Sequence, residues 1–151
     1  MNKSINLIKN DKKIWEVTKK YSNQHYEDDE SCIGYAIDVY QETINKTFRE
    51  YLVNFKYLTR LLENYGFVLL SKEEIKSLDL PGSIGYFDEL FASMELELKK
   101  DKRLSNKIGN ALFMSKEEKQ ISFLNKYFIF KKVRNIAVSY THLRAHETHE
   151  H

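Results

Sequence analysis

The amino-acid sequence predicts an α/β fold built as one domain. Short runs of strand-forming residues alternate with segments whose apolar residues recur at helical spacing, which is the layout of a sheet covered by helices. The chain has 151 residues, enough for one compact core, and 42% of them are hydrophobic while 30% are charged. Because it contains only 5 glycines and 1 proline, its composition argues against a loop-rich or disordered chain.

The first predicted element is a β-hairpin. Residues 14–19 are rich in strand formers, and residues 35–40 form a second strand with Ile37 and Val39 on one face. Between the two strands lies the polar stretch 22–31, which includes four consecutive acidic residues. A solvated connector is the favoured interpretation of these acids, and a metal site is the alternative.

A long amphipathic helix is predicted over residues 50–65. Apolar residues recur along it at helical spacing, and charged residues mark the opposite side. Thr47 and Glu50 fit a capping box at its start, while Gly66 suits the left-handed backbone that ends helices. The side chains expected to pack on the sheet are Phe55, Leu58 and Leu62.

The second half of the chain predicts two buried strands and three helices. Residues 67–70 and 127–130 are short apolar runs typical of central strands, and we expect them to pair antiparallel in one sheet. Capping boxes at Ser71 and Ser115 each begin a helix. A third helix is predicted over residues 87–98, where apolar residues form a stripe.

Charge, hydropathy and cysteine content narrow the possible classes of protein. Cys32 is the only cysteine, so an internal disulfide is impossible and a reducing compartment is expected. The net charge of +2 does not by itself indicate nucleic-acid binding. No apolar run approaches the roughly 20 residues that span a bilayer, and the start lacks the apolar core of a signal peptide. We therefore expect neither membrane insertion nor secretion.

Residues 138–151 are interpreted as a tail foreign to the protein. Within this tail, residues 138–148 resemble a translated sequencing adapter. Four of the five histidines lie in or just after this stretch, where they would otherwise suggest metal binding. We expect no metal site there, and we take residues 1–137 as the native part of the chain.

A family resemblance rests on residues 31–44, 50–55, 65–67 and 115–130. Its most specific part is the run Glu-Tyr-Leu-Val from residue 50, joined to the late run Asn-Lys-Tyr-Phe-Ile-Phe. In order and spacing, these stretches resemble the mRNA cap guanine-N7 methyltransferase domains in capping enzymes of large DNA viruses, such as giant viruses and poxviruses. The resemblance implies that residues 1–137 are the C-terminal part of a Rossmann-like class I methyltransferase fold. That fold has an antiparallel sheet edge and, here, an inserted β-hairpin beside the cap pocket.

The resemblance implies methyl transfer from S-adenosylmethionine to N7 of the guanine in the mRNA 5′ cap. Glu50 matches the family glutamate that contacts the cap guanine, and Tyr127 matches the tyrosine that lies against the base or ribose. Each residue keeps a structural alternative: Glu50 can complete a helix capping box, and Tyr127 can be an ordinary core aromatic. Because guanine N7 is an unprotonated lone pair, the reaction needs alignment rather than a general base, and no catalytic side chain is expected.

The sequence departs from the family in its cofactor motif. The family binds S-adenosylmethionine with a Gly-rich turn after its first strand and an acidic residue after its second, and neither pattern is present. Gly82 and Gly85 lie between predicted helices and are interpreted as a turn. The chain is therefore expected to be an inactive fragment that does not bind the cofactor alone. Its expected partners are capped mRNA, the missing N-terminal half and possible guanylyltransferase or triphosphatase domains, in a cytoplasmic viral factory or the host nucleus.

Two other functions stay open at the level of sequence. A non-catalytic, methyltransferase-like partner subunit of a capping enzyme would also lack the cofactor motif. A small RNA-binding module is the second alternative, with the basic residues 99–103 touching phosphates. A solvated loop is the favoured interpretation of those residues, and the small net charge weakens the second alternative.

Overall fold

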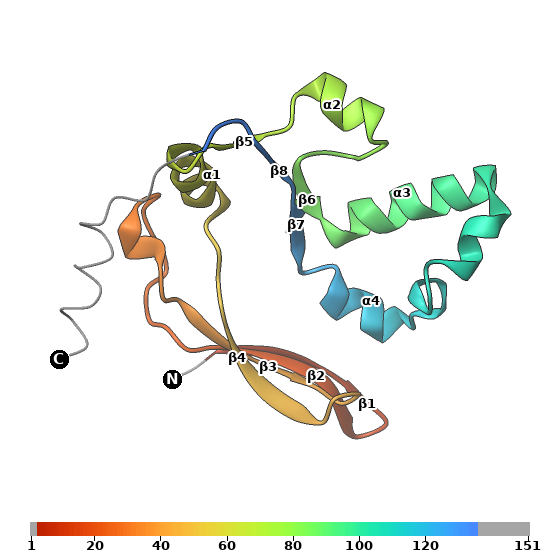
Figure 1. The fold of residues 1–151 in the computed structure, drawn as a ribbon. Coiled ribbons are helices and arrows are strands. Elements are labelled where there is room, and N and C mark those ends of the chain that lie inside the picture. Colours follow the sequence, from red (N-terminus) through yellow and green to blue (C-terminus); the bar gives the residue numbers. More distant parts are fainter. Residues whose placement is uncertain (1–2, 136–151) are drawn as a thin grey trace.

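The part of the chain that the structure describes, residues 3–135 of a computed structural model, begins with a four-stranded antiparallel sheet (Figure 1). The strands follow one another in chain order, and they are β1 (Ser4–Lys9), β2 (Lys12–Lys19), β3 (Ala36–Gln41) and β4 (Lys46–Tyr51). The predicted hairpin is confirmed, since β2 and β3 pair antiparallel with Val17 opposite Val39. The strands β1 and β4, which were not predicted from the sequence, extend this hairpin on both sides.

Residues 46–51 form β4, so the predicted helical start at Glu50 is wrong. Glu50 lies opposite Ile37 in the continuous β3–β4 ladder, and its capping box with Thr47 does not form. The strand preference of the β-branched Thr47 and the aromatic Phe48 competes with the capping pattern. Cross-strand pairing with β3 decides the outcome in favour of the strand.

The first helix is shorter than predicted and runs from Phe55 to Asn64 (α1). The Asn54 side chain caps its start by accepting hydrogen bonds from the backbone N–H groups of Lys56 at 3.0 Å and Tyr57 at 3.1 Å. Its end is as predicted, because Gly66 has a φ of 84° in the left-handed region.

The last strand segment pairs with two other strands, one after the other along its length. Its second half, β8 (Phe130–Lys132), pairs antiparallel with β5 (Phe67–Leu69), and its first half, β7 (Lys126–Phe128), pairs antiparallel with β6 (Ile84–Tyr86). The predicted pairing of residues 67–70 with residues 127–130 is confirmed only where Leu69 faces Phe130. It fails for the rest because the segment is interrupted at Ile129, whose N–H donates to the carbonyl of Ser83.

Two further expectations for these strands are wrong. The strands are not buried on both faces, since Leu69 is 39% exposed and Phe128 is 52% exposed. Gly85 does not lie in a turn but in β6, opposite Tyr127. A Cβ on Gly85 would come within 2.8 Å of the Tyr127 ring, so close packing of the two strands requires glycine here.

Three helices complete the described chain, and they are α2 (Lys72–Ser77), α3 (Phe87–Lys100) and α4 (Lys116–Ser122). Both predicted capping boxes are confirmed, with Ser71 bonded to Glu74 and Ser115 bonded to Glu118. Between α3 and α4 the chain forms two short 3-10 turns, η2 (Lys102–Asn106) and η3 (Ala111–Phe113). A further 3-10 turn, η1 (Glu30–Cys32), lies in the connector between β2 and β3.

A small hydrophobic core joins the N-terminal sheet to α4. Trp15 and Val39 from the sheet pack with Ile121 from α4, and each is no more than 9% exposed. Leu124 lies beyond the end of α4 and is 52% exposed.

The described residues form a mixed α/β structure whose strand pairings are all antiparallel. This agrees with the predicted α/β class. Within residues 3–135, no helix combines the length and the apolar character that crossing a bilayer requires. The interpretation of residues 138–151 as a foreign tail concerns residues outside the described part of the chain.

Candidate functional site

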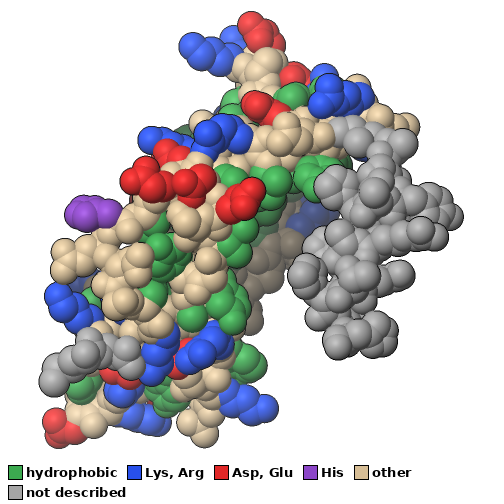
Figure 2. All heavy atoms as spheres, turned by 90° about the vertical axis from the view of Figure 1, so that its left-hand side faces the viewer, with side chains coloured by type: hydrophobic (Ala, Val, Ile, Leu, Met, Phe, Trp, Pro, Cys, Tyr) green, Lys and Arg blue, Asp and Glu red, His purple; other side chains and the backbone are tan. Residues whose placement is uncertain are grey.

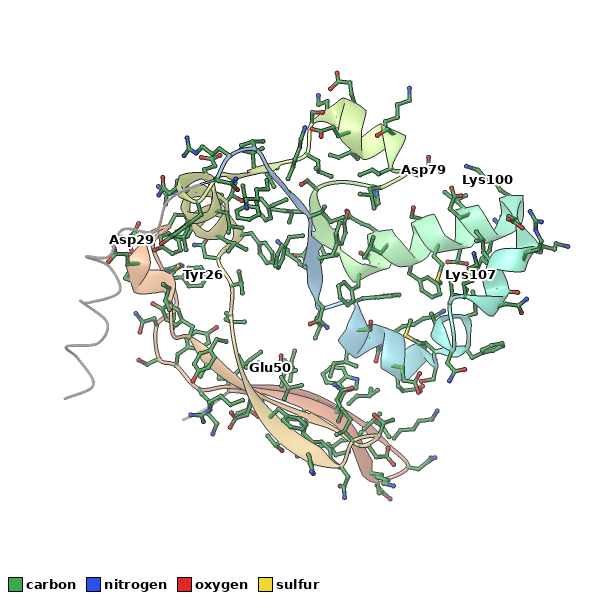
Figure 3. The ribbon with its side chains drawn as sticks, viewed as in Figure 1. Tyr26, Asp29, Glu50, Asp79, Lys100 and Lys107 are labelled. Carbon is green, nitrogen blue, oxygen red and sulfur yellow. The ribbon has the colours of Figure 1, made fainter. Side chains whose placement is uncertain are left out.

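A cleft of about 850 Å³ lies between the N-terminal sheet and the β6–β7 strand pair. Figure 3 labels Glu50 on β4 and Tyr26 on the connector between β2 and β3, and both residues line this cleft. The opposite wall is built by residues of α1, β6 and β7. Segments far apart in the sequence therefore meet around one cavity.

The floor of the cleft is the inner face of the sheet, which is largely apolar. Side chains alternate between the two faces of a strand, and the register places Val17 of β2 beside Val39 of β3 on this face. In the adjacent row, Lys19, Ile37 and Glu50 lie side by side across β2, β3 and β4. The outer face is polar, and the residues that share it include Asn6, Glu16, Thr18, Asp38, Thr47 and Arg49.

Glu50 differs from the other acidic residues of the four strands in having no partner. Asp38 on the outer face pairs with Arg49 at 3.0 Å, and this hydrogen bond holds the pKa of Asp38 below its ordinary value. Glu16 pairs with Lys13 at 3.1 Å. Among residues 3–135, no side chain donates a hydrogen bond to the Glu50 carboxylate or forms an ion pair with it. Its lone pairs are therefore available to a ligand in the cleft.

Aromatic rings from several segments line the walls. Tyr21 and Tyr26 come from the stretch after β2, and each packs its ring against Tyr35, with centroids 5.0 Å and 5.3 Å away. Phe55 begins α1, and Tyr86 ends β6. Aromatic rings from these different segments line the cleft, and a planar ligand can stack on their faces.

The acidic connector, residues 22–31, has a structural role in this arrangement. Asp28 accepts a hydrogen bond of 2.7 Å from the side chain of Asn54, which itself caps α1. Asp29 caps η1 by accepting from the N–H of Ser31. The connector, with Tyr26 on it, is thus tied to the start of α1. In the described part of the chain, no group of three His, Cys, Asp or Glu side chains is arranged to hold a metal.

The second predicted site residue, Tyr127, lies outside the cleft. Its side chain is 9% exposed, and its hydroxyl donates a hydrogen bond of 3.0 Å to the carbonyl of Gly82. Burial, helped by the nearby Glu89 carboxylate, raises the pKa of Tyr127. The structure therefore does not bring Tyr127 together with Glu50. Contact between Tyr127 and the cap stays a prediction from the family resemblance.

Lys126, the residue before Tyr127, does line the cleft. Its Nζ lies 4.7 Å from the ring centroid of Tyr86 and 5.1 Å from that of Phe55. Tyr26, Tyr86 and Lys126 were not predicted as site residues from the sequence. Each belongs to a different segment, and no periodic pattern links them, so only the folded chain shows that they share a cavity.

The basic stretch after α3 is partly neutralised by its own acidic neighbours. Lys100 pairs with Glu97 at 3.3 Å, and Arg103 pairs with Asp101 at 3.1 Å. These exposed pairs reduce the charge that the stretch presents to phosphates. The cleft, rather than this stretch, is therefore the stronger candidate site.

A second cavity of about 450 Å³ lies on the other side of the segment that follows β4. Figure 2 faces this side of the molecule and shows hydrophobic side chains exposed next to acidic ones. The cavity has few polar atoms, and its lining residues include Cys32, Ile33, Leu52, Val53, Tyr57 and Leu61. It offers apolar contact but no chemistry comparable to that of Glu50.

The strand-to-helix junction at the start of α3 does not fit S-adenosylmethionine. The only glycines near a strand-to-helix junction are Gly82 and Gly85, at the start of α3, among residues 3–135. That junction is filled by the protein itself, because the Tyr127 ring packs on Gly85 and the Glu89 carboxylate accepts from the N–H of Tyr86. No backbone there is open to a cofactor.

Comparison of the chain with protein-family models finds no match, and comparison with curated proteins finds none either.

Proposed function

We propose that this chain binds the guanine of an mRNA 5′ cap, as the guanine-binding part of a cap guanine-N7 methyltransferase domain. The observation that carries the proposal is the unpaired Glu50 carboxylate in a cleft whose walls hold tyrosine and phenylalanine rings. The position of Glu50 in the run Glu-Tyr-Leu-Val is also the position through which the family resemblance implies guanine contact.

The carboxylate suits guanine because it only accepts hydrogen bonds. The Watson–Crick edge of guanine presents two adjacent donors, N1–H and N2–H, and both oxygens of Glu50 can accept from them. Adenine presents an acceptor, N1, at the equivalent position, so it would place a lone pair against a negative charge. Recognition by this edge also leaves N7 free, whereas an arginine bound to O6 and N7 would block it.

The rings and lysines of the cleft suit the rest of a cap. Stacking of a base on an aromatic side chain contributes about 1–3 kcal/mol and depends little on which base is stacked. Tyr26, Phe55 and Tyr86 supply ring faces, while Glu50 would supply the selection. Lys19, which shares the cross-strand row of Glu50, and Lys126 bring positive charge to a cleft that would hold the cap's phosphates.

The strand arrangement also supports the proposal. The family resemblance implies a sheet with an antiparallel edge, and the β7–β8 segment pairs antiparallel with β5 and with β6. Because the junction at the start of α3 does not fit S-adenosylmethionine, we assign this chain no part in holding the methyl donor. Its proposed contribution is to bind guanine with N7 exposed, and to place the Glu50 charge near a base that becomes positive on methylation.

Binding of cap dinucleotides to the full chain tests this function. We expect calorimetry to show binding of GpppA and much weaker binding of ApppA. Glu50→Gln keeps the size of the side chain but replaces one acceptor with a donor, so it should weaken GpppA binding at least about tenfold, or ~1.4 kcal/mol.

Glu73→Gln is the matched control, because Glu73 lies on α2 and does not line the cleft. It should leave GpppA affinity unchanged. Equal affinity for GpppA and ApppA, or full GpppA affinity in Glu50→Gln, would contradict the proposed function.

A further inference from the structure

Lys126 places a positive charge among the rings of the cleft. Its Nζ contacts the faces of Tyr86 at 4.7 Å and Phe55 at 5.1 Å, both within the roughly 6 Å range of cation–π attraction. Lys126 is exposed, and the cleft is open to ligands. Ring faces that would attract a cationic ligand are therefore already in contact with a cation of the protein.

This placement matters because methylation at N7 changes the charge of guanine much more than its size. The base gains one methyl group, and it turns from a neutral ring into a cation. An aromatic cleft without a lysine would bind the cation more tightly, since cation–π attraction favours it. Glu50 acts in the same direction, because opposite charges attract more strongly near protein than in bulk water.

Lys126 acts against both of these effects. Its ammonium group repels a cationic base that approaches Tyr86 or Phe55, but it has no such effect on a neutral base. A neutral base can still stack against the rings or displace the flexible lysine side chain. Glu50 and Lys126 carry opposite charges in one cleft. Glu50 can therefore bind the hydrogen-bonding edge of guanine, while Lys126 offsets the attraction of the cleft for a positively charged base.

We propose that Lys126 is a selectivity residue that lowers the affinity of the cleft for cationic, N7-methylated guanine relative to neutral guanine. The inference rests on the proposed binding of guanine in this cleft. As a result, the cleft would bind the unmethylated cap and release the cap once it is methylated.

The test compares GpppA with m7GpppA, which carry the same phosphates and differ by one methyl group and one charge. Both affinities are measured by calorimetry for the full chain and for Lys126→Gln, Lys126→Arg and Lys107→Gln. We expect Lys126→Gln to shift the ratio of the two affinities toward m7GpppA by about three- to fivefold. Lys126→Arg keeps the charge and should keep the wild-type ratio.

Lys107→Gln is the charge-matched control, because Lys107 lies between α3 and α4 and does not line the cleft (Figure 3). It should leave the ratio unchanged, and circular dichroism should show the same fold for all variants. If both dinucleotides bind and Lys126→Gln leaves the ratio unchanged, this inference is overturned while guanine binding stands. If the wild-type chain binds neither dinucleotide at millimolar concentration, the proposed function and this inference are both overturned.

Discussion

Glu50 is exposed on the edge strand β4, and among residues 3–135 no side chain pairs with its charge. The family resemblance selected Glu50 from the sequence, but the local pattern assigned it to a helix cap. The structure places it in β4, where its side chain reaches the cleft because of strand alternation.

One substitution of Tyr127 can distinguish its structural role, the hydrogen bond to Gly82, from the contact with the cap that the resemblance implies. Tyr127→Phe removes the hydrogen bond to the Gly82 carbonyl and leaves that acceptor without its partner, so we expect a loss of about 1 kcal/mol in the free energy of unfolding. Urea denaturation measures this loss. GpppA affinity should stay unchanged in the variant, because Tyr127 does not line the cleft. A weaker affinity with unchanged stability would favour the contact with the cap that the resemblance implies.

At the scale of elements, the sequence predicted features that depend on nearby residues, such as helix caps, but not all of the strand pairings. The capping boxes at Ser71 and Ser115 depend on residues three positions apart, and the structure contains both. By contrast, β1, β4 and β6 form because they pair with neighbouring strands. The strand propensity of a single segment does not indicate which strand it will pair with. The predicted helix over residues 50–65 failed at its start for this reason, since pairing with β3 extended the strand to Tyr51.

Asn54 connects helix capping to the shape of the cleft, which gives a second prediction. Its side chain caps α1 and also donates to Asp28, so it holds the connector that carries Tyr26. Asn54→Ala should cost about 1 kcal/mol of stability and should also weaken GpppA binding, because Tyr26 loses its support.

Ser71→Ala is the matched comparison for Asn54→Ala, because it removes a helix cap that lies away from the cleft. It should lower stability by a similar amount, about 1 kcal/mol, without changing GpppA affinity. Thermal denaturation and calorimetry on both variants separate the two effects. Equal affinity losses in the two variants would mean that general destabilisation, and not the position of Tyr26, weakens binding.

At the scale of the whole molecule, the width of the cleft depends on how the N-terminal sheet is held against α4. The contacts across this boundary include the packing of Trp15 and Val39 on Ile121 and the ion pair of Lys9 with Glu117 at 3.0 Å. The ion pair is exposed, and the lysine lowers the pKa of Glu117 through a hydrogen bond. Exposed pairs contribute little to stability, whereas buried apolar packing contributes most of it. The apolar contact should therefore dominate.

Substitutions of Ile121 and Lys9 test whether the apolar packing or the ion pair holds the sheet against α4. Ile121→Ala removes a side chain that is 9% exposed and leaves a cavity between the sheet and α4, so we expect it to lower the free energy of unfolding by about 2–3 kcal/mol. GpppA affinity should fall as well, because Ile121 also lines the cleft and loss of its packing lets the sheet move away from β7.

Lys9→Gln removes the ion pair and should change neither the urea midpoint nor the affinity measurably. A larger loss of stability in Lys9→Gln than in Ile121→Ala would show that charge, and not apolar packing, holds the two parts of the cleft together.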